Sequence, residues 1–187
     1  MFCLRGAAAH SDARRQRLFE TLRAVHPGIR ALETHYVHLI DAARPLDEAE
    51  RRVLDALLAE GGPTPQGAPA PSPSDETGAL ELHALPRFGT ISPWSSKATE
   101  IVHNCGLDVV RRVERGVTYR LLLEPSVADA STEEEAALVR ALAPALHDRM
   151  TESLLRRLDD AAALFDRAEP RPFATVDVLG RGADAIR

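Results

Sequence analysis

The sequence predicts an α+β protein in which helices cover antiparallel sheet. The chain of 187 residues is 44% hydrophobic and 27% charged, which is typical of globular proteins with one substantial core or two small ones. Apolar residues alternate with a period of two in some segments and recur at helical spacing in others. These segments follow the order βαβα and then βαββα. We therefore expect two pseudo-repeated halves, arranged as two helix-covered sheets or as one continuous antiparallel sheet.

The first half begins with a short apolar run over residues 1–6, which is typical of a buried strand. Ser11 has the chemistry of an N-cap for a helix whose pattern stops at Pro27. β-branched and aromatic residues over 29–40 predict a second strand. Asp47 then predicts the N-cap of a second helix.

A Pro-rich stretch over residues 63–78 separates the halves, with Gly, Ala and Ser between its prolines. A segment of this composition cannot offset the entropy of ordering by burying a core. We expect an exposed, mobile linker inside one domain that spans residues 1–169.

The second half begins with an alternating strand pattern over residues 80–85. Ser92 and Pro93 predict the N-cap and first position of a helix that ends near Cys105. Strand material follows over residues 109–124, and we expect a turn in it. The residues of that turn are Glu114-Arg115-Gly116.

The longest helix is predicted to begin at Thr132 and to reach Ala168, with a bend or break at Pro144. Residues 173–179 predict another strand. Residues 180–187 read as the opening of a helix that the chain end interrupts. We therefore expect a truncated chain.

Residues 87–116 differ from the surrounding Ala-, Leu- and Arg-rich sequence and contain the only tryptophan. Lys97 lies in the first helical turn, where a cation meets the positive end of the helix dipole. A break with a local rule is often found where a residue contacts a partner or ligand. Helical spacing predicts that four side chains face a sheet: Trp94, Ala98, Ile101 and Cys105.

Three interpretations of this turn stay open: docking of another domain, which we favour, an anion held by hydroxyls and free helix amides, and ordinary capping. The residues expected to form the interdomain docking motif are Thr90, Ser92, Trp94, Ser95, Ser96, Lys97, Asn104 and Arg115.

Catalytic alternatives find little support in the sequence. A Ser96–Lys97 nucleophile pair is disfavoured because adjacent side chains on a helix diverge by about a hundred degrees. The histidines have no recognised metal-ligand spacing, and no Gly-rich phosphate loop occurs. We expect no metal, no cofactor and no catalytic residue in this chain, which alone should be inactive.

The net charge of −5 gives no reason to expect nucleic acid or an anionic membrane as a partner. The two cysteines lie far apart and no apolar run is long enough to span a bilayer. A reduced, cytoplasmic protein is the resulting expectation.

One run closely resembles the amino-terminal domain of large, single-chain phosphoribosylformylglycinamidine synthases: Gly89-Thr90-Ile91-Ser92-Pro93-Trp94-Ser95-Ser96-Lys97-Ala98-Thr99-Glu100-Ile101. Further segments resemble that family in the same order: Leu4-Arg5-Gly6, residues 33–38, Asn104-Cys105-Gly106-Leu107, Glu114-Arg115-Gly116 and residues 147–152. The similarity covers nearly the whole chain, and the Pro-rich linker is least alike.

The resemblance implies part of a ligase of purine biosynthesis that is glutamine-dependent and needs ATP and magnesium. It implies a domain like a fused dimer of the small stand-alone subunit, which docks the synthetase and glutaminase domains and helps to enclose an ammonia passage. The family's catalytic residues would all lie beyond this chain, and residues 170–187 would begin the family's linker region. Two rivals stay open: an independent subunit or binding module that acts in trans, and a small hydrolase that uses Ser96 and Lys97.

Overall fold

The computed structural model describes residues 1–59, 78–128, 131–166 and 172–185. The predicted Pro-rich linker lies outside the described residues except for Gly78. Among the described residues no helix is both long and apolar enough to cross a bilayer.

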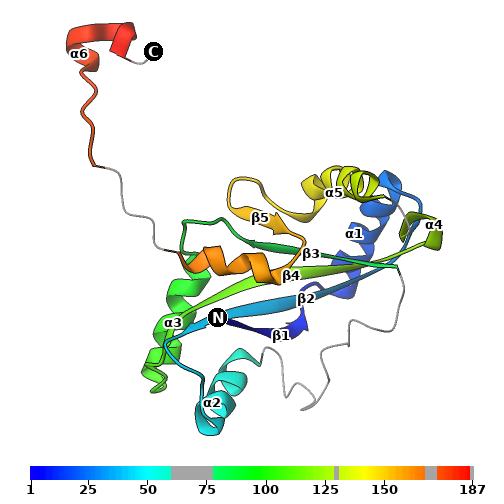
Figure 1. Cartoon of the computed structure of the whole chain (residues 1–187), viewed down its shortest axis with the longest axis horizontal. Coiled ribbons are helices and arrows are strands. Elements are labelled where there is room, and N and C mark those ends of the chain that lie inside the picture. Colours follow the sequence, from blue (N-terminus) through cyan, green and yellow to red (C-terminus); the bar gives the residue numbers. More distant parts are fainter. Residues whose placement is uncertain (60–77, 129–130, 167–171, 186–187) are drawn as a thin grey trace.

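The described strands form one antiparallel sheet, which matches the single-sheet form of the prediction (Figure 1). Their order is β1-β2-β4-β3-β5. The strands are β1 (Phe2–Ala8), β2 (Ile29–Ala42), β3 (Ala79–Pro86), β4 (Val110–Leu123) and β5 (Glu152–Leu155). The long strands β2 and β4 pair at the centre, so each half of the chain adds its first strand, β1 or β3, to the outer side of its second.

Four long helices begin where polar side chains cap the first turn. They are α1 (Asp12–Val25), α2 (Glu48–Leu58), α3 (Pro93–Asn104) and α5 (Thr132–Leu146). Their N-caps are Ser11, Asp47, Ser92 and Ser131, and each side chain accepts a hydrogen bond from a backbone amide in the first turn. Predicted starts at Ser11, Asp47 and Ser92 are thus confirmed. A short helix, α4 (Pro125–Ala128), follows β4.

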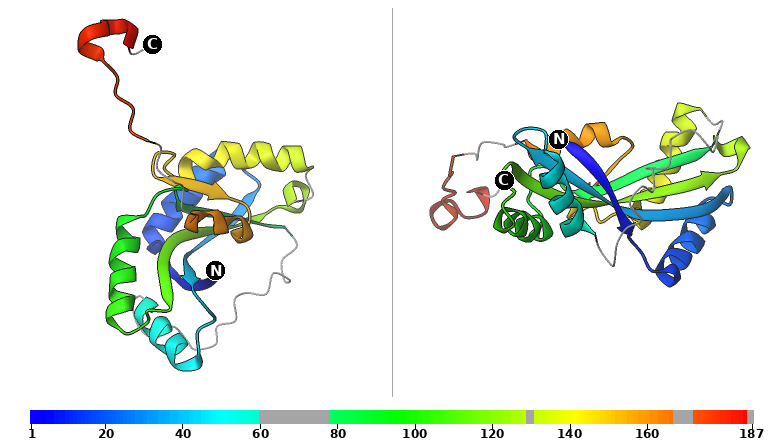
Figure 2. Two further views of the ribbon diagram at one scale, coloured as in Figure 1. Left: turned by 60° about the vertical axis from the view of Figure 1, so that its left-hand side comes forward. Right: turned by 90° about the horizontal axis from the view of Figure 1, so that it is seen from below.

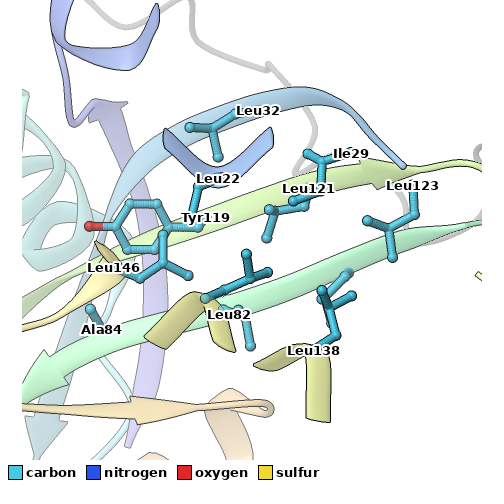
Figure 3. Close-up of a cluster of buried hydrophobic side chains, with 12 residues drawn as sticks. Leu22, Ile29, Leu32, Leu82, Ala84, Tyr119, Leu121, Leu123, Leu138 and Leu146 are labelled. Carbon is cyan, nitrogen blue, oxygen red and sulfur yellow. The ribbon is translucent and has the colours of Figure 1, made fainter. Parts of the chain in front are cut away.

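One face of the sheet carries two apolar clusters. The first joins α1 and α5 to the strands, and Figure 3 shows its residues converging between the sheet and the helices. Leu22 of α1 and Leu142 of α5 are fully buried in it. The second cluster joins α2 and α3 to the other end of the sheet through Leu54, Val102 and Ile40. Figure 2 shows that the α1–α5 pair and the α2–α3 pair lie at opposite ends of the strands.

The opposite face is covered in part by a 3₁₀ helix, η1 (Leu158–Phe165). Leu39 points to this face because successive strand residues point to opposite sides, whereas its neighbour Ile40 belongs to the helix-covered face. Leu164 of η1 packs with Leu39 and Leu85 in a third cluster.

The turn expected inside residues 109–124 is wrong, because β4 runs through Gly116 without interruption. This glycine lets two strands approach. A Cβ on Gly116 would lie 2.3 Å from Leu85 Cδ2 and 2.6 Å from the carbonyl oxygen of Ala84 in the adjacent strand. The short polar run before a glycine resembles a turn, but its side chains are used for packing and ion pairing inside the sheet.

The helix expected to reach Ala168 ends at Leu146 instead. Pro144 lies inside its last turn, and His147 has extended backbone with φ −149°. β5 and the 3₁₀ helix η1 follow, and their apolar residues pack in the first and third clusters of the sheet instead of continuing α5. The prediction of a strand over 173–179 is also wrong: residues 172–177 have no regular structure and α6 (Val178–Arg181) begins within the range.

The last described residues, α6 and the 3₁₀ turn η2 (Gly182–Ala185), stand apart from the sheet in Figure 1. The side chains of Leu179 in α6 and of Phe173 in the preceding segment are fully exposed.

Candidate functional site

The candidate site lies where α3 begins beside β4. β3 pairs with β4 only over residues 117–122, so the earlier part of β4 has no strand on that side. α3 occupies the position instead. Thr99 Oγ1 accepts a hydrogen bond from the Val113 amide at 3.0 Å, and His103 Nε2 lies 2.6 Å from the Val110 carbonyl oxygen. Helix side chains therefore satisfy backbone groups that a neighbouring strand would otherwise pair.

A buried carboxylate, Glu114, fixes the start of α3. Its side chain is fully buried and accepts hydrogen bonds from the amide and hydroxyl of Ser92 at 3.3 and 2.7 Å. Arg112 makes an ion pair with the same carboxylate and also donates to the carbonyl oxygens of Thr90 and Leu164. The network ties the turn before α3 to β4 and to η1.

A stack of aromatic and cationic side chains lies beside this network. The guanidinium of Arg115 lies 4.6 Å from the centroid of Trp94 and 4.3 Å from that of Tyr36. The Trp94 ring also stacks on His38, with centroids 5.7 Å apart and planes inclined by 28°. The expected packing of Trp94 against the core is confirmed, because the ring is half-buried against the α2–α3 cluster.

His38 is only 1% exposed, and neither ring nitrogen has a hydrogen-bond partner. Burial, followed by the charge of Arg115, lowers the pKa of His38 to about 4. The imidazole is therefore neutral at physiological pH and serves as a flat surface for Trp94.

A cavity of about 490 Å³ opens between the α3 turn and the loop before β5. Thr90, Ser92, Trp94 and Arg115 line it. Exposed apolar side chains also surround it: Ile91 is 62% exposed and Met150 is 75% exposed. The surface combines an apolar rim with hydroxyl and guanidinium groups.

The structure brings together only part of the predicted docking motif. Ser95 is buried under the turn, and its hydroxyl has no hydrogen-bond partner. Ser96 is exposed and Asn104 lies at the far end of α3. Lys97 is 75% exposed and pairs with Glu100 at 3.5 Å.

Two other interpretations can be compared with this geometry. Lys97 is not a desolvated amine, so the conditions for a Ser96–Lys97 nucleophile are not met. At the helix start, the Glu114 carboxylate accepts from the amide and hydroxyl of Ser92, the N-cap residue of α3. Among the described residues no group of three His, Cys, Asp or Glu side chains is arranged to hold a metal ion.

The spacing that predicted the buried face of α3 is wrong at two positions. Ser95 and Val102 are buried, whereas Ile101 is 45% exposed and Cys105 is exposed. The helix is turned so that Ser95 approaches the sheet closely. Sequence reasoning also missed Glu114, Arg112, Tyr36 and His38 as site residues, since only the strand register places them beside the turn.

The fold and site define an α+β domain whose surface turn before α3 is held by the buried Glu114–Arg112 network. The family model of the formylglycinamide ribonucleotide amidotransferase N-terminal region matches residues 35–165. The chain belongs to this family, the amino-terminal domain of phosphoribosylformylglycinamidine synthase.

Proposed function

We propose that this chain is the docking domain of the ligase that converts formylglycinamide ribonucleotide to formylglycinamidine ribonucleotide with ATP and glutamine. In this proposal it holds the synthetase and glutaminase domains together and helps to enclose the passage for ammonia. ATP and magnesium bind to residues outside this chain, and the chain alone has no activity.

The observation that carries the proposal is the contrast between neighbouring residues in the α3 turn. Ser92 donates a hydrogen bond to the buried Glu114 carboxylate, while the adjacent Ile91 is 62% exposed. A rigid turn that displays an apolar side chain beside polar groups is typical of a contact surface between domains. Such a turn loses little entropy when a partner covers it.

The strand order supports the fused-dimer part of the proposal. Each half contributes a pair of strands, β1 with β2 and β3 with β4, and the two pairs meet through β2 and β4. A two-fold axis between β2 and β4 would exchange the halves. α1 and α3 then occupy equivalent places in the chain order.

The test is an Ile91→Asp substitution in the intact enzyme. Product formation is measured twice, with glutamine and with an ammonium salt as nitrogen source. Loss of docking should lower the glutamine-dependent rate about tenfold, because a buried charge costs more than 1.4 kcal/mol, and leave the ammonia-dependent rate unchanged.

Val25→Asp is the matched control, because Val25 is a 45%-exposed apolar residue on α1 that does not line the cavity. Both rates should stay at the wild-type level in this variant. Equal glutamine-dependent rates in Ile91→Asp and wild type would contradict the proposed docking surface.

A further inference from the structure

A second cavity lies on the same face of the sheet, between the start of α1 and the end of α5. Its volume is about 780 Å³, within the range of small-molecule sites. Tyr36 and Val117 form part of its wall and also line the cavity beside α3. The two cavities thus adjoin over β2 and β4 and share Glu152 of β5, but the arginines of the second cavity come from α1 and from the loop after α5.

Two arginines line this cavity, Arg14 from α1 and Arg149 from the loop after α5. Neither guanidinium makes an ion pair or hydrogen bond within the part of the chain that the structure describes. By contrast, the next residue on α1, Arg15, pairs with Asp12 at 3.0 Å. Guanidinium groups are suited to bidentate contact with phosphate or carboxylate oxygens.

The side chain of Tyr119 also lines this cavity. Tyr119 is 6% exposed, and Figure 3 shows its oxygen pointing away from the labelled apolar side chains. This hydroxyl has no hydrogen-bond partner among the described residues. Burial, with Glu152 second, raises the pKa of Tyr119 to about 12, so the group keeps its proton and can donate it.

A buried polar atom without a partner, Nδ1 of His10, lies near Tyr119. The ring of His10 is 5.9 Å from that of Tyr119, and its Nδ1 is buried without a partner. Burial, followed by the charge of Arg14, lowers the pKa of His10. Buried polar atoms are usually hydrogen-bonded, so the unpartnered Nδ1 of His10 is suited to a polar atom of a ligand in the cavity.

Carboxylates complete the lining. Glu152 Oε2 accepts from the Asp148 amide at 2.9 Å, and Asp148 Oδ1 accepts from the Met150 amide at 2.8 Å. Each carboxylate keeps a second oxygen for a donor. The cavity therefore offers cations to one part of a ligand and acceptors to another. A ligand that is only anionic would meet repulsion from Glu152.

We infer that this cavity binds a phosphorylated sugar, with the phosphate between Arg14 and Arg149 and sugar hydroxyls on Glu152, Tyr119 and His10. A zwitterionic amino acid has the same mixture of charges, but the volume fits the larger ligand. Binding here involves no residue of the α3 turn, so its test does not depend on the docking role.

The test is titration calorimetry on the purified protein with ribose 5-phosphate, ribose, inorganic phosphate and glutamate as separate probes. Ribose 5-phosphate should bind saturably and at least about tenfold more tightly than ribose or phosphate, since only it engages both parts of the site. Arg14→Ser and Arg149→Ser should each weaken it about tenfold.

Arg17→Ser is the matched control, because Arg17 is exposed on α1 and does not line the cavity. Tyr119→Phe removes one hydroxyl and should weaken binding several-fold; thermal melting checks that each variant is folded. Any other sugar-phosphate site in the protein would be insensitive to these substitutions. No saturable binding, equal affinity in Arg14→Ser and wild type, or tighter binding of glutamate would overturn the inference.

Discussion

The Glu114 carboxylate accepts a hydrogen bond of 2.7 Å from the hydroxyl of Ser92, a residue 22 positions away in the chain. The same Ser92 oxygen accepts from the Ser95 amide at 3.0 Å. One hydroxyl therefore links a buried acid in β4 to the first turn of α3, and negative charge is placed at the positive end of the helix.

Glu114→Gln should lower the free energy of unfolding by about 3 kcal/mol, because Arg112 would remain partly buried without its counter-ion. Urea denaturation measures this change. Glu100→Gln is the control: Glu100 is 62% exposed and its pair with Lys97 should contribute less than about 0.5 kcal/mol. Equal midpoints for the two variants would show that the buried network does not stabilise the turn.

Local chemistry explains why much of the fold was predictable. Ser11, Asp47 and Ser92 each accept from an amide three residues on, so the signal and its structural effect lie within one turn. The strand over residues 29–40 was also predicted correctly. Its β-branched and aromatic residues favour extended backbone, and they lie in the part of β2 that pairs with β4. These elements depend little on distant contacts.

The candidate site was less predictable because it depends on register. Arg115 pairs with His38 across β2 and β4, and this pairing brings the guanidinium over Tyr36 and Trp94. A shift of one residue would send these side chains to the other face. The motif around Trp94 was visible in the sequence, and residues 33–38 and 114–116 shared the family resemblance, but nothing in the sequence placed these strand residues beside the turn.

A second prediction concerns Gly116, which lies inside β4 where a turn was expected and lets β3 approach closely. Gly116→Ala should destabilise the fold by about 1–3 kcal/mol, since the added methyl group meets a backbone oxygen that cannot move freely. Hydrogen exchange at β3 amides should accelerate with it.

Gly89→Ala provides the comparison for Gly116. Gly89 has φ +79° and nothing within 4 Å of an added Cβ, so only backbone strain of about 1 kcal/mol opposes the change. Exchange at β3 should stay at the wild-type rate in that variant. If Gly116→Ala were neutral in urea denaturation, close approach of β3 and β4 would not be the reason for glycine.

His38 predicts how stability depends on pH. Its folded pKa of about 4 lies below the ordinary 6.5, so the unfolded chain binds more protons between these values. The contribution of neutral His38 to the free energy of unfolding is complete above pH 6.5. It is lost as the pH falls toward 4. Between pH 7 and pH 5 the loss from this residue should be about 2 kcal/mol.

His38→Gln should therefore reduce the difference in unfolding free energy between pH 7 and pH 5 by about 2 kcal/mol, whatever its effect at pH 7. Urea denaturation at both pH values gives the difference. Trp94→Phe changes the stacked neighbour without removing a titrating group and should keep the wild-type pH dependence. His35 and His83 have pKa values lowered to about 4, chiefly by burial, so part of the acid sensitivity should remain. If the difference in unfolding free energy between pH 7 and pH 5 were the same in His38→Gln and wild type, the difference in proton binding between the folded and unfolded states would arise from other residues.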